Sequence, residues 1–273
     1  MLVIFIVVFG LIMGSFLCAS VWRLHEQNKK TSKKRNAELS IIKGRSICPN
    51  CSHQLQARDL IPVFSWFVLR GKCRYCNKPI GLTEPLVELV TAALFVFSYI
   101  FWPQPFHGVG LFEFILWLIF LTGFIALALY DLRWYVLPNK IVYILLVLAF
   151  IQVVVVIALF HGGLAALFTA FWGVVVTAGL FYFIFLISAG KWIGGGDVKL
   201  GAVLGLVVGG PLSSVLLLFL ASTAGSLLSV PLLVSHRAKT STRIPFGPFL
   251  ILAAILTRLF GVGIIAWYKR LYL

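Results

Sequence analysis

Long apolar segments recur along almost the whole sequence, and they constrain the fold more than any other feature. A helix needs about 20 mainly apolar residues to cross a bilayer whose hydrocarbon core is roughly 30 Å thick. Such segments occur at 1–22, 86–102, 111–130, 141–160, 164–189, 198–210, 212–234 and 248–267. The sixth is short and rich in glycine, which indicates a tilted, re-entrant or half-buried helix. We therefore expect an all-α polytopic membrane protein with about eight transmembrane helices.

The composition excludes several other classes of protein. Of the 273 residues, 61% are hydrophobic and 11% are charged, whereas soluble domains are near half apolar and a quarter charged. A soluble globule, a disordered chain and a collagen-like fibre are therefore excluded. The formal net charge of +15 is unevenly distributed, because 13 of the 23 Lys and Arg residues lie between Arg23 and Lys78.

The basic residues also predict the topology. One set of connections is rich in Lys and Arg (23–84, 131–140, 190–199 and 235–247), and the other has none (103–110, 161–163 and 210–211). The positive-inside rule places the first set in the cytoplasm and the N-terminus outside; Lys269 and Arg270 are the exception. We expect the basic residues to contact anionic lipid headgroups. We expect no nucleic-acid partner, because few aromatic residues accompany these charges and no recognisable binding module is present.

This pattern predicts three parts. Residues 1–22 form a first transmembrane helix, 23–84 form a cytoplasmic basic insert, and 85–273 form a transmembrane core.

Four of the five cysteines form two Cys-x-x-Cys knuckles in the insert. Cys48 and Cys51 are separated from Cys73 and Cys76 by 21 residues, and this spacing is typical of a four-thiolate zinc ribbon. The alternatives are two disulfides or redox-active thiols, but a cytoplasmic location argues against stable disulfides. Four protein ligands leave no open position, so the zinc is expected to be structural. Cys18 lies in the first apolar segment and is expected to be a packed apolar residue.

Two of the eight carboxylates are the candidate catalytic residues. Asp131 follows a long apolar segment, and Asp197 follows Gly194, Gly195 and Gly196 and precedes another. By the predicted topology both lie at the cytoplasmic mouth of the membrane, where ionisable groups are costly and usually functional. When two carboxylates share a site, one stays protonated while the other holds a water molecule as a base. That is the chemistry of an aspartic protease.

Simpler roles remain open for these residues. Asp197 could cap the helix that follows it, whereas Asp131 ends its helix at the terminus that the helix dipole disfavours for an anion. Lys199 could extend to lipid headgroups or stabilise an ionised Asp. Glu88, one turn after Glu84, could pair with the insert or belong to a site, and the sequence does not decide.

The motifs together resemble one family. The sequence shows GxGDxK from Gly194 to Lys199, Asp131 followed by Leu-Pro-Asn at 137–139, paired Cys-x-x-Cys knuckles, and the segments 14–24, 84–91 and 244–250 (IPFGPFL). In this order and combination the chain resembles the type IV prepilin peptidases, membrane aspartic proteases of the GxGD type. It departs from them at Cys18, where Asn is usual.

The resemblance implies a function. It implies that Asp131 and Asp197 activate a water molecule for cleavage, with Gly194, Gly196 and Lys199 supporting the site. The implied substrates are type IV prepilins or pseudopilins, cut behind a short basic leader at the cytoplasmic face of the bacterial inner membrane. It also implies methylation of the new N-terminus with S-adenosylmethionine, for which the sequence reveals no binding residues.

Two other classes of function compete with this one. A transporter or ion channel could use Asp131 and Asp197 as a proton or cation relay, and a zinc-ribbon protein without enzymatic activity could act in assembly at the membrane. A relay fits poorly, because the outer halves of the apolar segments carry almost no polar groups.

Overall fold

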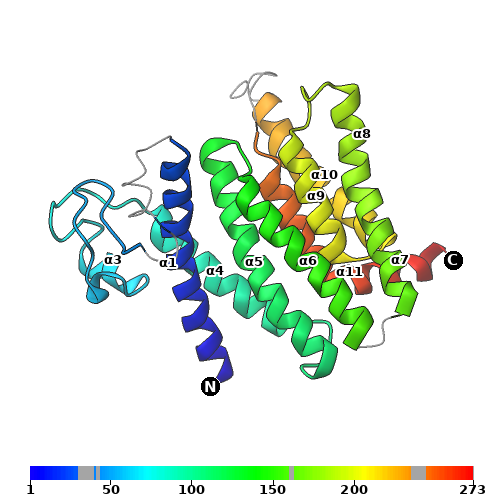
Figure 1. The fold of residues 1–273 in the computed structure, drawn as a ribbon, viewed down its shortest axis with the longest axis horizontal. Coiled ribbons are helices and arrows are strands. Elements are labelled where there is room, and N and C mark those ends of the chain that lie inside the picture. The colour runs from blue at the N-terminus through cyan, green and yellow to red at the C-terminus, as the bar shows by residue number, and fades with distance from the viewer. Residues whose placement is uncertain (30–39, 41–43, 160–162, 235–243, 273) are drawn as a thin grey trace. The chain divides into compact units, whose positions relative to one another are not determined.

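The computed structural model describes residues 1–29, 40, 44–159, 163–234 and 244–272. The basic run at 30–35 and the loop 235–243, on which part of the expected topology rests, lie outside these described residues. The helices are α1 (Leu2–Asn28), η1 (Ala57–Asp59), α3 (Phe64–Val68), α4 (Thr83–Ile100), α5 (Gly108–Trp134), α6 (Asn139–Leu159), α7 (Gly163–Val174), η2 (Val175–Gly179), α8 (Leu180–Ile187), α9 (Gly195–Val208), α10 (Pro211–Val234) and α11 (Gly247–Tyr272) (Figure 1).

The expected all-α membrane fold is confirmed. Within the described ranges seven helical segments are long and apolar enough to cross a membrane, with α7, η2 and α8 forming one of them. Helices satisfy their backbone hydrogen bonds internally, which a spanning segment in lipid requires. The expected segment 198–210 is the exception: it forms α9, whose 14 residues extend only about 21 Å. The chain is therefore a multi-pass membrane protein with one shorter helix.

The chain forms two compact units, residues 1–100 and 101–273. In the first unit, α1 and α4 pack closely through small residues. A Cβ at Gly10 would lie 2.6 Å from the Cα of Ala92, and one at Gly14 would lie 2.6 Å from the Cα of Glu88. Small residues let helix backbones approach closely where lipid removes the hydrophobic drive for association. In the described part of the insert between these helices, the elements are η1 and α3, and both are short.

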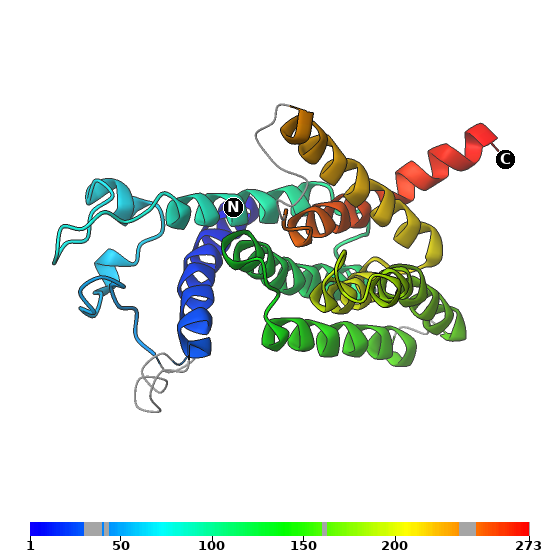
Figure 2. The ribbon, with the colours of Figure 1, turned by 90° about the horizontal axis from the view of Figure 1, so that it is seen from above.

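In the second unit, α9 is held by helices on several sides. It packs against α6, α7 and η2, and α6 lies on the side of α9 away from α10 and α11 (Figure 2). The π-helical turn η2 contributes the buried Thr177, whose hydroxyl donates to the Gly201 carbonyl across 2.7 Å. A Cβ at Gly205 would lie 2.5 Å from the Gly173 carbonyl oxygen, so glycine is needed at this crossing. These contacts fix the short helix that carries Asp197.

Candidate active site and metal centre

Asp131 lies in the last turn of α5 and is 6% exposed. The helix ends just beyond it, where Tyr135 adopts a left-handed conformation with φ 55° and its N–H donates to the Asp131 carbonyl across 2.8 Å. The Asp131 side chain is held from another element, because its Oδ2 accepts the backbone N–H of Gly247 at 3.1 Å. Gly247 begins α11, so the end of α5 meets the start of α11 here.

Asp197 lies in the first turn of α9. Gly194 is the N-cap and has extended backbone angles, so Asp197 is not the N-cap residue and lies inside the first turn. The Asp197 N–H donates to the Gly194 carbonyl across 3.0 Å, and the Gly194 N–H hydrogen-bonds the Asp197 carboxylate in return. The helix dipole favours an anion at this position. The Asp131 carboxylate is near enough to act electrostatically on Asp197.

Leu137 fills the space between the helix ends that carry these groups. This residue is buried, and a Cβ at Gly196 would lie 3.1 Å from the Leu137 Cβ. A Cβ at Gly247 would lie 3.5 Å from Leu137 Cδ2 and only 2.7 Å from Asp131 Oδ2. Glycine at positions 196 and 247 therefore allows the starts of α9 and α11 to approach the end of α5. We call this meeting of α5, α9 and α11 the three-helix junction.

Lys199 contacts α6. Its Nζ donates to Asn139 Oδ1 across 2.9 Å and lies 5.3 Å from the centre of the Tyr143 ring. This contact with α6 is in addition to the two roles that the sequence left open, which stay predictions. The side chain fixes α9 to the start of α6, two residues beyond Asp197.

The four cysteines of the insert come together. Their Sγ atoms all lie within 4.8 Å of one another, and those of Cys48 and Cys76 are 4.0 Å apart. A tetrahedral zinc with Zn–S bonds of about 2.3 Å requires sulfur atoms about 3.8 Å apart, so the donor set fits a zinc ion. All five cysteines are free thiols, which excludes the alternative of two disulfides in this structure.

The two knuckles have the same backbone turn. The Cys48 N–H donates to the His53 carbonyl and the Cys73 N–H donates to the Lys78 carbonyl, both across 2.9 Å. Isolated bridges between Ile47 and Gln54 and between Lys72 and Pro79 close the turns. Each knuckle thereby presents two thiols on one side, as a shared metal requires.

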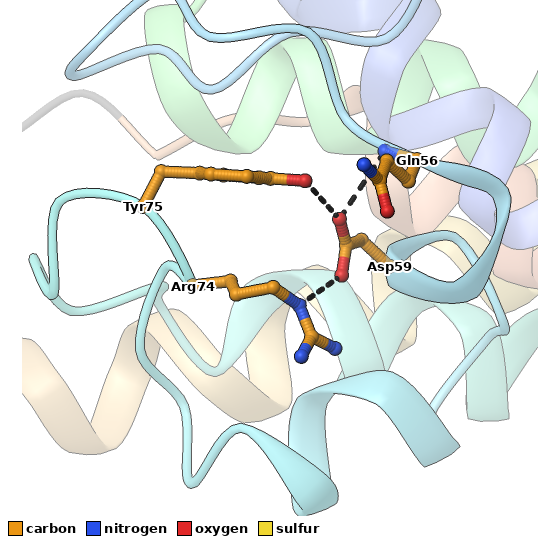
Figure 3. Close-up of polar contacts among 4 residues, drawn as sticks. All are labelled: Gln56, Asp59, Arg74 and Tyr75. Carbon is orange, nitrogen blue, oxygen red and sulfur yellow. Dashed lines mark hydrogen bonds and ion pairs between the residues drawn. The ribbon is translucent and has the colours of Figure 1, made fainter.

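Asp59 holds the second knuckle to the segment that follows the first knuckle (Figure 3). Its Oδ1 accepts Arg74 Nε at 2.7 Å, and its Oδ2 accepts the Tyr75 hydroxyl at 3.0 Å and the Gln56 N–H at 3.2 Å. The Tyr75 ring in turn lies 3.7 Å, between ring centres, from His53 of the first knuckle. Burial acts to raise the pKa of Asp59, but the three donated hydrogen bonds outweigh it and lower the pKa. The sequence had suggested no particular role for this carboxylate.

Glu88 holds the insert against α4. Its Oε2 accepts the backbone N–H of Val63 at 2.6 Å. Val63 has φ 61° and ψ −51°, a strained conformation close to that of a γ-turn, and the Phe64 N–H donates to the Pro62 carbonyl across this turn. The contact of Glu88 with the insert is thus made through a backbone amide, whereas the sequence had left open an ion pair with the insert or a place in a site.

A part-buried ion pair near the start of α5 was not predicted from the sequence. Glu113 Oε2 accepts Arg258 Nη2 at 2.5 Å and Gln104 Nε2 at 2.7 Å, and the Arg258 guanidinium lies 5.0 Å from the Trp102 ring centre. Glu113 and Arg258 side chains are 12% and 14% exposed. The expectation that the outer halves of the spans carry almost no polar groups is therefore incomplete. The signal was a single charge inside each of two apolar segments, because an isolated buried charge needs a partner.

Comparisons with known proteins identify the family. Residues 8–102 match the model of the bacterial peptidase A24 N-terminal domain, and residues 118–230 match that of the type IV leader peptidase family. The first match contains the four clustered cysteines, and the second contains Asp131 and Asp197. No solved structure matches the chain.

Relatives match over nearly the full length. The chain is 33% identical to the prepilin leader peptidase/N-methyltransferase of Stutzerimonas stutzeri, covering 96% of this chain and 92% of that protein. It is 30% identical to the protein of the same name from Bacillus subtilis, covering 97% of each. It is 32% identical to a type 4 prepilin-like proteins leader peptide-processing enzyme of Escherichia coli, covering 91% of this chain and 90% of that protein. The chain therefore belongs to the type IV leader peptidase family.

Proposed function

We propose that this protein is a membrane aspartic endopeptidase that removes the leader of type IV prepilins or pseudopilins. The observation that carries the proposal is the three-helix junction, where Asp131 from α5 and Asp197 from α9 lie within electrostatic reach. Family membership supports peptidase chemistry and gives no support to a transporter that uses the same two residues as a relay.

The proposed reaction divides the two carboxylates by protonation state. The ionised Asp takes a proton from a water molecule, and the water oxygen attacks the scissile carbonyl carbon. The protonated Asp donates its proton to the carbonyl oxygen. As the C–N bond breaks, the proton taken from water passes to the leaving amine. The other Asp takes a hydroxyl proton back, so the products are a carboxylic acid and an amine and both Asp residues return to their starting states. Gly247 N–H holds Asp131 Oδ2 in place, while Gly194 and Gly196 shape the start of α9 and Lys199 fixes it to α6.

The site is proposed to open on the cytoplasmic side of the inner membrane, with the N-terminus outside. Arg133, Lys140, Lys191 and Lys199 lie close in sequence to Asp131 and Asp197, and basic residues mark cytoplasmic ends. A prepilin leader that is short and basic would remain on that side, with its apolar segment in the bilayer. Anionic headgroups would contact the same basic residues.

Two further groups belong to this proposal. Cys48, Cys51, Cys73 and Cys76 would hold one zinc ion, which supplies folding energy to an insert that has little core of its own. The names of the relatives include N-methyltransferase, so we also propose methylation of the new N-terminal amine. S-adenosylmethionine would supply the methyl group when bound.

The decisive experiment co-expresses the chain with a prepilin and follows removal of the leader by a gel shift. We expect Asp131→Asn and Asp197→Asn each to abolish processing while both proteins remain in the membrane. Glu26→Gln is the matched control, because it changes a carboxylate whose ion pair is with exposed Lys29 on its own helix, and we expect full processing. Processing by either Asp variant would refute the assignment. Labelled methyl donor in the same assay tests the second activity, which is wrong if wild type cleaves without labelling the product.

A further inference from the structure

The zinc-binding insert carries an apolar patch that its own fold does not cover. The patch consists of Leu60, Ile61, Phe64, Phe67 and Val68. In α3 the exposed fractions of Phe64, Phe67 and Val68 are 61%, 65% and 59%, although these are among the most apolar residues of an otherwise polar segment. Contiguous exposed apolar residues of this kind mark a surface that binds a membrane or a protein.

The side of α3 opposite the patch packs against the rest of the insert. Trp66 donates its indole N–H to the Ile80 carbonyl across 3.4 Å. Its ring would lie 2.9 Å from a Cβ at Gly71, where φ is +65°. The inward-facing side chain thus fixes the orientation of α3, and the patch is held outward by a folded element.

The depth of the patch follows from the bond between Val63 and Glu88. Glu88 is the sixth residue of α4, about 8 Å along the axis from its start. The 18 residues of α4 extend about 27 Å, slightly less than the roughly 30 Å of the hydrocarbon core, so the whole helix is needed to span it. The Val63 N–H reaches the Glu88 carboxylate at 2.6 Å. Val63 therefore lies within about 8 Å of the end of α4, a depth at which interfacial segments lie, and α3 begins at the next residue.

Basic side chains flank the patch. Arg58 precedes it and Arg70 and Lys72 follow it, and all three are exposed. An apolar face bordered by Lys and Arg is the composition of segments that lie in the membrane interface, where the cationic groups attract anionic headgroups.

We propose that this patch is an interfacial membrane anchor, which seats the zinc-binding insert on the lipid surface beside α4. Phe64, Phe67 and Val68 enter the boundary between headgroups and acyl chains, and Arg70 and Lys72 contact anionic headgroups. The anchor then holds the insert at a fixed depth relative to the bilayer surface. The proposal rests on α4 crossing the membrane and not on the peptidase activity, so an inactive chain would still bind lipid through this patch.

Photo-crosslinking tests the anchor in the full-length chain. Benzoylphenylalanine replaces Phe67, or in a second variant Phe64, and the protein is reconstituted in vesicles of phosphatidylethanolamine and phosphatidylglycerol. The matched control carries the same group in place of Lys78, which is exposed on the second knuckle. Each protein must elute as a single species on gel filtration before illumination.

We expect phospholipid adducts, found by mass spectrometry of the digested insert, at about ten-fold higher yield from positions 67 and 64 than from position 78. Equal yields from the patch and the control would overturn the proposal. A parallel sample contains a prepilin. Adducts to prepilin that replace the lipid adducts at position 67 would also overturn it, because the patch would then be a substrate-binding surface.

Discussion

The backbone N–H of Gly247 donates to Oδ2 of Asp131 across 3.1 Å, which joins two residues 116 positions apart. Glycine at position 247 contributes in two ways to this contact. The amide holds the carboxylate oxygen, and the missing side chain leaves room, because a Cβ there would lie 2.7 Å from that same oxygen. Because there is no room for a Cβ, even the methyl group of alanine at position 247 would displace the Asp131 carboxylate.

Gly247→Ala tests this relationship. We expect kcat for prepilin cleavage to fall about 100-fold, since a shift of about 1 Å in a reacting group has that effect, with KM almost unchanged because the added methyl group meets the Asp131 carboxylate. Gly263→Ala is the matched control in the same helix, where a Cβ meets nothing within 4 Å. A kcat for Gly247→Ala equal to that of the control would show that the contact does not position Asp131.

Replacing a ligand tests the metal centre. Purified wild type should carry about one zinc ion, and Cys48→Ser or Cys73→Ser should remove it, because three thiolates cannot close the tetrahedral shell. Elemental analysis gives the metal content. Cys18→Ala is the control, since Cys18 is buried in α1 outside the cluster. Full zinc content in both serine variants would contradict the assignment.

Asp59→Asn tests the contact between Asp59 and the second knuckle. We expect zinc loss to a chelator about ten-fold faster than in wild type, the effect of removing a group that orients metal ligands. Because the pKa of Asp59 is lowered, its carboxylate contribution is fully present above about pH 4 and is lost only as the pH falls further. The difference should therefore be constant from about pH 6 to about pH 8. Gln54→Ala, at an exposed neighbouring position, should release zinc at the wild-type rate.

The part-buried ion pair between α5 and α11 leads to a prediction about stability. Arg258→Met leaves the Glu113 charge without its cation, and we expect a loss of about 3 kcal/mol in the free energy of unfolding. Adding Glu113→Gln to this variant should restore much of the loss, because the unpaired charge is gone. Thermal unfolding in detergent measures both. A double variant less stable than Arg258→Met alone would contradict this account.

The parts of the fold that follow from local sequence could be predicted. Spanning segments are visible because bilayer thickness sets their length, and Cys48, Cys51, Cys73 and Cys76 are visible because two knuckles are a local pattern. The carboxylates Asp131 and Asp197 could be singled out because so few acidic residues adjoin the apolar segments. Their approach in space could be expected only from the family resemblance.

The remaining features depend on contacts between distant elements. No local signal links Gly247 to Asp131, Val63 to Glu88, or Lys199 to Asn139, because each contact is set by how helix ends meet after packing. The length of α9 was ambiguous for a related reason. Glycine is a weak helix former, so its glycines made a long helix uncertain. In the structure Gly201 and Gly205 allow α9 to pack closely against η2 and α7.

The π-helical turn η2 sets the rotational register of the helix that follows it. In the present register Phe181 of α8 is buried, and its Cδ2 would lie 2.9 Å from a Cβ at Gly201 of α9. If Val175–Gly179 kept its length but formed a regular α-helix, each residue would add about 100° of rotation, more than in the wider π turn, and α8 would be rotated about its axis. Phe181 would then turn away from α9. The wider turn of this segment, more than the chemistry of its side chains, therefore determines which face of α8 supports the helix that carries Asp197.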